Sequence, residues 1–139
     1  MRALIVGHDQ YRRSLAKSLG IGISELTVLT QLNNAGPLSP RRIAGVLGFT
    51  TGSTTAVLDR AEAAGFIVRT PNPADRRGLL IALTPAGQRA MTWMTSQLEA
   101  RLTEALGGYS DDELADLTQA MTVIGITFEQ AQADSFTVV

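Results

Sequence analysis

The stretch from Asp75 to Gly87 reads DRRGLLIALTPAG and joins three local patterns. Two arginines followed by a glycine, residues 76–78, are typical of an exposed basic turn. The apolar run over residues 79–83 predicts a short strand. Thr84-Pro85 then predicts the start of a helix, because proline fits the first helical turn. The stretch therefore predicts a basic hairpin that leads directly into a long helix.

The other strand of this hairpin is expected at Phe66-Ile67-Val68. The residues between the two strands, 69–78, include Pro71 and Pro73, which predict a stiff, exposed loop at the tip. An ordinary solvated loop is the alternative, since arginines are common on protein surfaces. The position of the loop directly behind two short helices favours a functional tip.

Two short helices joined by a tight turn precede the hairpin. Ser39-Pro40 predicts the start of the first, with serine as the N-cap, and Gly48 ends it. Either Thr50 or Thr51 is expected to cap the second, which runs to about Ala64 before Gly65. This arrangement is typical of a helix-turn-helix. With the basic hairpin behind it, the sequence predicts a winged helix-turn-helix.

Further helices are expected on both sides of this motif. Residues 2–19 carry apolar side chains at helical spacing, and Ser24 is expected to cap a second helix. A long helix over residues 85–106 is followed by a final helix that opens with a capping box, Ser110–Glu113. The expected inward faces comprise Leu26, Leu29 and Leu32, then Ile43, Val46 and Leu47, then Met91, Met94, Leu98, Leu102 and Ala105, and finally Leu114, Leu117, Met121, Ile124 and Phe128.

The charge of the chain is unevenly distributed. The net charge of −1 divides into +2 for residues 1–35, +4 for residues 36–89 and −7 for residues 90–139. The basic segment coincides with the predicted helix-turn-helix and hairpin. A basic segment of this kind is typical of a surface that contacts the phosphates of nucleic acid.

Several classes of protein do not fit the composition. The chain has no cysteine and a single histidine, His8, which argues against a disulfide, a thiolate zinc site or a histidine-rich metal site. No apolar run approaches the roughly 20 residues needed to span a bilayer, so we expect a soluble, cytoplasmic protein without membrane contact. No nucleophile–base pair or glycine-rich phosphate loop is recognisable, so we expect neither an enzyme nor a bound cofactor.

Two sequence patterns resemble the MarR family of bacterial transcription regulators, and the resemblance covers nearly the whole chain. One is the D-R-x-E-x-x-G pattern that begins at Asp59 and is closed by Arg69. The other is the D-x-R pattern at Asp75 and Arg77, followed by a short strand, Leu-Thr and a glycine. Their members are Asp59, Arg60, Glu62, Gly65 and Arg69, then Asp75, Arg77, Leu83, Thr84 and Gly87.

The resemblance implies a mainly α fold of about six helices with a two-stranded antiparallel hairpin. It implies one MarR-like domain over residues 1–139, with dimerisation helices at 1–23 and 107–139. Residues 24–88 are then the winged helix-turn-helix, and residues 85–106 the long connecting helix. It further implies an intertwined homodimer.

As a function, the resemblance implies a sequence-specific regulator that binds a pseudo-palindromic operator in double-stranded DNA. Its recognition helices would enter successive major grooves and its wings the flanking minor grooves. We expect a repressor that a small effector releases. The alternative is a dimeric winged-helix interaction module that does not bind DNA. The basic middle segment and the pattern at Asp75 and Arg77 favour DNA binding.

The recognition helix begins with small, uncharged residues. Ser53, Thr54 and Thr55 are expected to meet base edges, and Thr51 and Gly52 to approach phosphate through backbone N–H groups. For Thr51 the alternative is N-capping alone. Many members of the family carry arginine or glutamine near position 56, where this chain has alanine. Readout by hydroxyls and methyl groups is less selective, so specificity should depend more on the wing and on DNA shape.

Arginines in the wing are the leading candidates for groove contacts. Arg77 is expected to enter a narrow minor groove, and Asp75 to hold its guanidinium. A simple turn-forming aspartate is the alternative for Asp75. Arg76 is expected to touch phosphate or an acid of its own domain.

Four further residues are candidates for contacts with the DNA backbone. Ser39, Arg41 and Arg42 open the first helix of the motif, with an exposed, solvated arginine pair as the alternative. Arg60 either reaches phosphate or pairs with Glu62 or Asp59.

The resemblance also implies an effector pocket between the dimerisation helices and the DNA-binding lobe. By segment, its candidate lining residues are His8, Tyr11, Arg12 and Trp93, and its ligand a small amphipathic anion. Each has an alternative role: Trp93 in the core, Tyr11 in helix packing, and His8 and Arg12 on the surface.

Overall fold

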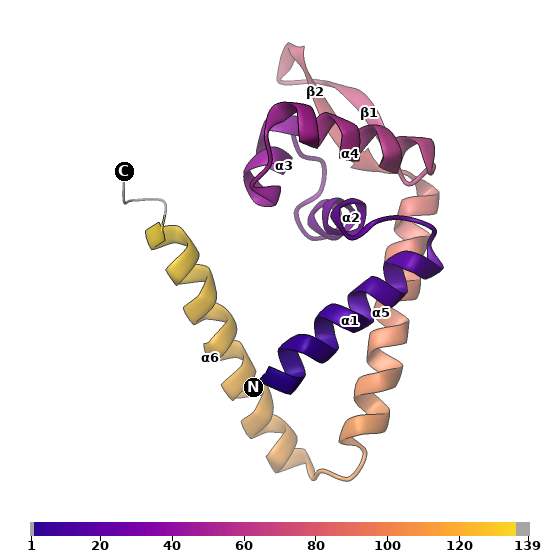
Figure 1. The fold of residues 1–139 in the computed structure, drawn as a ribbon. Helices are drawn as coiled ribbons and strands as arrows, with labels where there is room; N and C mark the ends of the chain where they lie inside the picture. The colour runs from indigo at the N-terminus through magenta and orange to yellow at the C-terminus, as the bar shows by residue number, and fades with distance from the viewer. Residues whose placement is uncertain (1, 136–139) are drawn as a thin grey trace. The chain divides into compact units, whose positions relative to one another are not determined.

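The computed structural model describes residues 2–135, apart from the side chains of residues 76, 77, 129 and 131–135. Within this range the chain forms six helices and a two-stranded antiparallel sheet (Figure 1), which confirms the predicted fold class. The helix-turn-helix consists of α3 and α4, and the strands form the wing. The elements are α1 (Arg2–Ser18), α2 (Ile23–Ala35), α3 (Pro40–Leu47), α4 (Thr51–Ala63), β1 (Ile67–Asn72), β2 (Asp75–Leu83), α5 (Pro85–Leu106) and α6 (Asp111–Ser135).

The chain divides into two compact units, residues 1–97 and residues 98–139. The first unit contains the helix-turn-helix, the wing and the hydrophobic core, and the second contains the end of α5 together with α6. None of the helices in the described part of the chain combines the length and the apolar character that crossing a membrane requires.

Local capping determines where the helices of the motif begin. Ser39 accepts a hydrogen bond from the backbone N–H of Arg42 at 3.3 Å, as expected of an N-cap. For α4 the cap is Thr50 rather than Thr51, because the hydroxyl of Thr50 accepts from the N–H of Ser53 at 3.3 Å. The prediction that Ser24 caps the second helix is wrong. That helix starts at Ile23, and Gly22, two residues before Ser24, occupies the N-cap position without a side-chain cap.

The core of the first unit is built on α2 and is covered by α3, α4 and β2. Leu26, Leu29 and Leu32 are all buried, as predicted. In α3 only Ile43 is fully buried, whereas Val46 is 41% exposed, which corrects its predicted place in the core. An eight-residue helix has little more than two turns. The neighbouring elements cover the face of α3 that carries Ile43 and Leu47, and Val46 lies beside that face.

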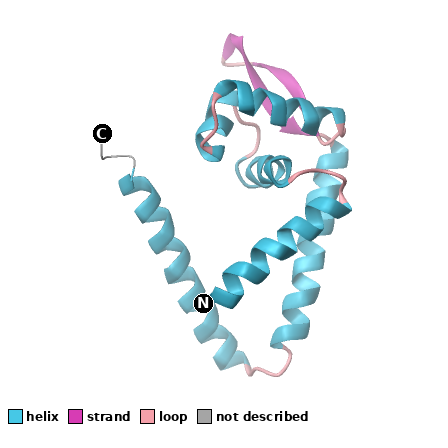
Figure 2. Ribbon diagram, in the orientation of Figure 1, coloured by secondary structure: helices cyan, strands magenta, loops and turns pink. Residues whose placement is uncertain are grey.

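The wing is longer and its turn tighter than the sequence indicates (Figure 2). The strands pair from Ile67 opposite Leu83 to Pro71 opposite Leu79, and the register then shifts so that Asn72 lies opposite Asp75. The expected loop over residues 69–78 is therefore wrong, because both strands extend into it. Proline lacks an N–H, yet it is tolerated beside such an irregularity in a two-stranded sheet.

The base of the wing is fastened to the start of α5. The hydroxyl of Thr84 donates to the carbonyl oxygen of Gly65 at 2.6 Å and accepts from the N–H of Gly87 at 3.0 Å. The backbone N–H of Thr84 donates to the carbonyl oxygen of Phe66. A Cβ atom at position 87 would overlap that same carbonyl oxygen, so a glycine is required there. This close approach explains the Leu-Thr and glycine of the second family pattern.

The second unit shows the predicted capping box at the start of α6. The backbone N–H and the hydroxyl of Ser110 both donate to Oε2 of Glu113, at 2.8 and 2.9 Å. These two hydrogen bonds, the backbone one first, lower the pKa of Glu113 below its ordinary value. Farther along α6, Met121 is 47% and Phe128 64% exposed, so the predicted apolar stripe is not covered within its own unit.

Candidate nucleic-acid interface

The N-terminal half of α4 presents small polar side chains to solvent. Thr51, Ser53 and Thr55 are exposed. Thr54 is only 2% exposed, and its hydroxyl donates to the carbonyl oxygen of Thr50 at 2.9 Å. The expectation that Thr54 meets base edges is therefore corrected. It lies three and four residues before the buried Val57 and Leu58, which places all of them on the inward face of the helix.

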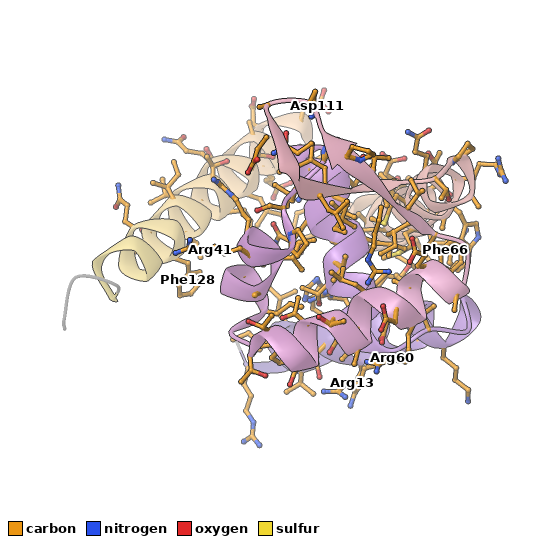
Figure 3. The ribbon with its side chains drawn as sticks, turned by 90° about the horizontal axis from the view of Figure 1, so that it is seen from above. Arg13, Arg41, Arg60, Phe66, Asp111 and Phe128 are labelled. Atoms are coloured by element: carbon orange, nitrogen blue, oxygen red, sulfur yellow. The ribbon has the colours of Figure 1, made fainter. Side chains whose placement is uncertain are left out.

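The first turns of α3 and α4 enclose a shallow groove of about 300 Å³. The backbone N–H groups at the start of each helix carry partial positive charge and favour anions. Arg41 and Arg42 are exposed on α3, with Arg41 at the groove (Figure 3). The hydroxyl of Ser39 is engaged as the N-cap. The groove is lined by Pro40, Arg41, Ala44, Thr51, Thr54 and Thr55.

Arg60, on the side of α4 (Figure 3), has a different acidic partner from the two considered in the sequence. Its Nε donates to Oε1 of Glu25, on α2, at 2.5 Å, so the predicted pairing with Glu62 or Asp59 is wrong. The side chain of Arg60 is 60% exposed, whereas that of Glu25 is 4% exposed. Sequence reasoning missed Glu25, and its only signal was a charged residue within an otherwise apolar helix face.

The acids Asp59 and Glu62 instead pair with Arg69, from the first strand of the wing. One terminal nitrogen of Arg69 donates to Oδ1 of Asp59 at 2.7 Å, and the other pairs with Oε2 of Glu62. Burial lowers the pKa of Arg69, but its hydrogen bonds and charge interactions with the two carboxylates outweigh burial and raise that pKa. Arg69 therefore pairs with both acids on the helix that carries the candidate base contacts, and its positive charge offsets one of their two negative charges.

At the wing tip, the carboxylate of Asp75 lies over the backbone of Gly78. A Cβ atom at position 78 would be 3.4 Å from Oδ2 of Asp75. The side chains of Arg76 and Arg77 lie outside the described residues. The expected contact between Asp75 and Arg77 stays a prediction.

Two of the four effector candidates face the interior of the first unit. Arg12 is half-buried, and its Nη2 donates to the hydroxyl of Thr27 on α2 at 3.1 Å. Within the described part of the chain, the hydroxyl of Tyr11 is buried and has no hydrogen-bond partner. His8 is exposed, and Trp93 is 37% exposed rather than in the core. The structure thus brings Tyr11 and Arg12 to the α1–α2 side and leaves His8 in solvent.

The helix pair, the wing and the exposed first turn of α4 define a winged helix-turn-helix regulator, and comparisons with known proteins specify its family. The model of the MarR family matches residues 21–79. The HTH-type transcriptional regulator YcgE of Bacillus subtilis is 30% identical over 104 residues, which cover 75% of this chain and 68% of YcgE. The multiple antibiotic resistance protein MarR of Escherichia coli is 30% identical over 113 residues, covering 78% of this chain and 76% of that protein.

Solved structures agree with the sequence relatives. A MarR family protein from Bacillus stearothermophilus superposes with a TM-score of 0.82 at 19% identity, over 92% of this chain and 89% of the other. The apo form of MarR from E. coli gives a TM-score of 0.64 at 27% identity, over 89% and 96%. This chain belongs to the MarR family. It is a DNA-binding transcription regulator.

Proposed function

We propose that the protein is a homodimeric repressor that binds a pseudo-palindromic operator and leaves it when a small amphipathic anion binds. The observation that carries the DNA-binding part is the α3–α4 surface. It combines two adjacent helix N-termini, two exposed arginines and exposed hydroxyls, while Arg69 offsets part of the charge of the acids farther along α4. Such a surface suits a phosphate backbone and a major groove. Binding to chromosomal DNA would take place in the cytoplasm.

In this proposal some contacts position the protein on the duplex, and others read the base sequence. Arg41, Arg42 and the backbone N–H groups of Thr51 and Gly52 contact phosphate, which fixes the protein on the duplex. Ser53 and Thr55 face base edges. There their hydroxyl groups can donate a hydrogen bond to a base or accept one from it, and their short side chains can touch a thymine methyl group. The wing arginines Arg76 and Arg77 add the phosphate and minor-groove contacts.

The apolar surface that the second unit leaves exposed supports the proposed dimer. In the second unit Leu98, Leu102, Met121 and Phe128 are each at least 40% exposed. Large exposed apolar stripes mark protein–protein interfaces. A second copy of the chain would cover them and would set the spacing between two recognition helices, as a two-fold operator requires.

The decisive experiment selects the preferred duplex from a random DNA library with the full-length protein. We expect an enriched two-fold site whose half-sites lie about one helical turn apart, 10–10.5 base pairs. Arg41→Ala should weaken binding to all duplexes alike, because a phosphate contact carries no sequence information. The matched control is Arg101→Ala, which removes an exposed arginine of the second unit. Failure to enrich any sequence would contradict the operator-binding proposal.

The effector part rests on Tyr11 and Arg12. A buried hydroxyl without a partner favours a ligand or a water that supplies one. A half-buried guanidinium one position along α1 from a tyrosine suits a carboxylate on an apolar body. For regulation, the ligand must bind the state that cannot hold DNA more tightly than the state that can.

A panel of aromatic carboxylates, from benzoate to naphthoate, tests the effector. We expect at least one to raise the melting temperature of the free protein and to weaken operator binding. Arg12→Ala should abolish both effects, while His8→Ala, on the exposed side of the same helix, should retain them. A panel that changes neither quantity would remove the support for a small-anion effector.

A further inference from the structure

We propose that Glu25 is a positioning residue for DNA recognition, because its buried carboxylate sets the rotation of α4 about its own axis through Arg60. The inference rests on the proposed function, in which α4 reads base edges. Glu25 belongs to α2 and touches no DNA in that arrangement. Its effect on recognition would be entirely indirect.

The carboxylate of Glu25 lies between two elements. Oε1 accepts a hydrogen bond from Nε of Arg60 at 2.5 Å, across a separation of 35 residues. Oε2 lies so close to Gly22 that a Cβ atom on that residue would overlap it. Glu25 is also in the first turn of α2, where the helix dipole favours a negative charge. The carboxylate therefore lies between the N-terminus of α2 and the side of α4, and its hydrogen bond to Arg60 connects the two helices.

Because Glu25 is buried, its ion pair with Arg60 favours one position of α4. The residue is 3% exposed, and a buried carboxylate that loses its partner is strongly destabilised. The side chain of Arg60 is 60% exposed, and its Nε reaches Oε1 of Glu25. A rotation of α4 that moved Arg60 away would leave the charge of Glu25 uncompensated.

The other flank of α4 carries two further ion pairs. At 3.6 residues per turn, Arg60 and Glu62 point about 160° apart around the helix. Glu62 and Asp59 pair with Arg69 of the wing, while Arg60 pairs with Glu25 of α2. Two anchors on opposite flanks resist rotation in both directions. Ser53 is seven residues, or about two turns, before Arg60, so the anchor at Arg60 sets the direction in which Ser53 points.

The variant Glu25→Met distinguishes a positioning role of Glu25 from an effect of net charge alone, because the two hypotheses predict different changes in DNA binding. Removing an acid should strengthen binding to every duplex if only net charge matters. If Glu25 positions α4, the ratio of operator affinity to affinity for an unrelated duplex should fall about tenfold, the loss expected for one disturbed base contact. The salt dependence of binding should stay unchanged, since no phosphate contact is removed.

The experiment measures that ratio for the wild-type protein and for four variants, Glu25→Met and the three below, together with melting temperature and sedimentation. Glu25→Gln should retain most of the ratio, because its amide oxygen still accepts from Arg60. Glu104→Met removes an exposed acid that pairs with Arg101 on α5, and it should leave the ratio unchanged. Arg60→Lys keeps the charge but lacks Nε, and it should lower the ratio even if Glu25→Met does not fold.

The outcomes distinguish the two proposals. A wild-type protein that prefers no duplex would contradict the proposed function and, with it, the role of Glu25. A wild-type protein with a clear preference that Glu25→Met and Arg60→Lys both retain would overturn only the positioning role.

Discussion

Helices α4 and α6 differ in how many of their side chains are buried or paired within their own chain. In α4, four residues including Val57 and Leu58 are buried, and ion pairs hold both flanks. In α6, none of the side chains that the structure describes is buried. The comparison indicates that α4 is already packed and presents a free outer face, whereas α6 leaves its apolar stripe exposed, where the proposed dimer would cover it.

The largest expected effect concerns that uncovered stripe. Met121→Asp places a charge in the proposed dimer interface, where it would lose its hydration without gaining a partner. We expect the dissociation constant of the dimer to rise by about a thousandfold, roughly 4 kcal/mol, with operator binding lost in parallel. Sedimentation over a range of protein concentrations measures this change.

Gln119→Asp is the control for that experiment, because position 119 points away from the stripe on the same helix. A monomeric, folded wild-type protein at micromolar concentration would contradict the comparison between α4 and α6 directly.

A smaller loss is expected within the first unit, at the junction of wing and α5. Gly87→Ala forces a Cβ atom into the carbonyl oxygen of Phe66, so the backbone has to move. We expect the free energy of unfolding to fall by about 3 kcal/mol, measured by urea denaturation. Gly45→Ala provides the control: it adds a methyl group to the interior of α3 where no atom lies within 4 Å, and it should raise stability by up to about 1 kcal/mol. Equal stabilities of the two variants would argue against the close approach at Gly87.

The wing arginine gives the next effect in size. Arg77→Ala should leave fold and dimer intact, because truncation at an exposed tip creates no cavity. Operator affinity should fall by about 1–3 kcal/mol, together with the preference for A·T-rich flanks, if the arginine reads a narrow minor groove. Titrations against operator and flank-swapped duplexes at several salt concentrations measure both. Unchanged affinity at every salt concentration would remove the wing from the mechanism.

Arg42→Ala is the comparison for Arg77→Ala. Because Arg42 is proposed to contact phosphate, its removal should weaken binding to all duplexes alike and reduce the slope of the salt dependence of binding by about one unit. A loss of flank preference in this variant would contradict its assignment to phosphate.

Short-range signals predicted the elements well, because caps and turns depend on residues a few positions apart. Ser39-Pro40 and the capping box at Ser110 both predicted helix starts that the structure confirms. Apart from the wrong N-cap at Ser24, the errors arose where distant segments decide. The partner of Arg60 is Glu25, 35 residues away, and no local pattern identifies it.

Neighbouring residues also differ in ways that depend on packing. Thr54 is buried between the exposed Ser53 and Thr55, and Val46 falls outside the stripe that the core covers. Helical periodicity alone does not decide whether a residue at the edge of the buried face is itself buried or exposed. The wing strands extend beyond their apolar runs because pairing with the opposite strand, rather than hydrophobicity, holds their outer ends.

The smallest expected effect probes the anchoring of α4 without changing any charge. Gly22→Ala places a methyl group where Oε2 of Glu25 now lies, while the extended backbone at position 22, with φ −82° and ψ 169°, accepts alanine. The flexible carboxylate can shift, so we expect little loss of melting temperature. The shift should nevertheless disturb the hydrogen bond to Arg60 and lower the preference for operator over unrelated duplex by about threefold, less than the loss of one whole base contact. Gly7→Ala, in α1 with no atom within 4 Å of the added methyl group, is the matched control. If both alanine variants keep the wild-type preference, the position of the carboxylate does not control α4, and the contrast between an anchored α4 and an uncovered α6 would rest on core packing and on Arg69 alone.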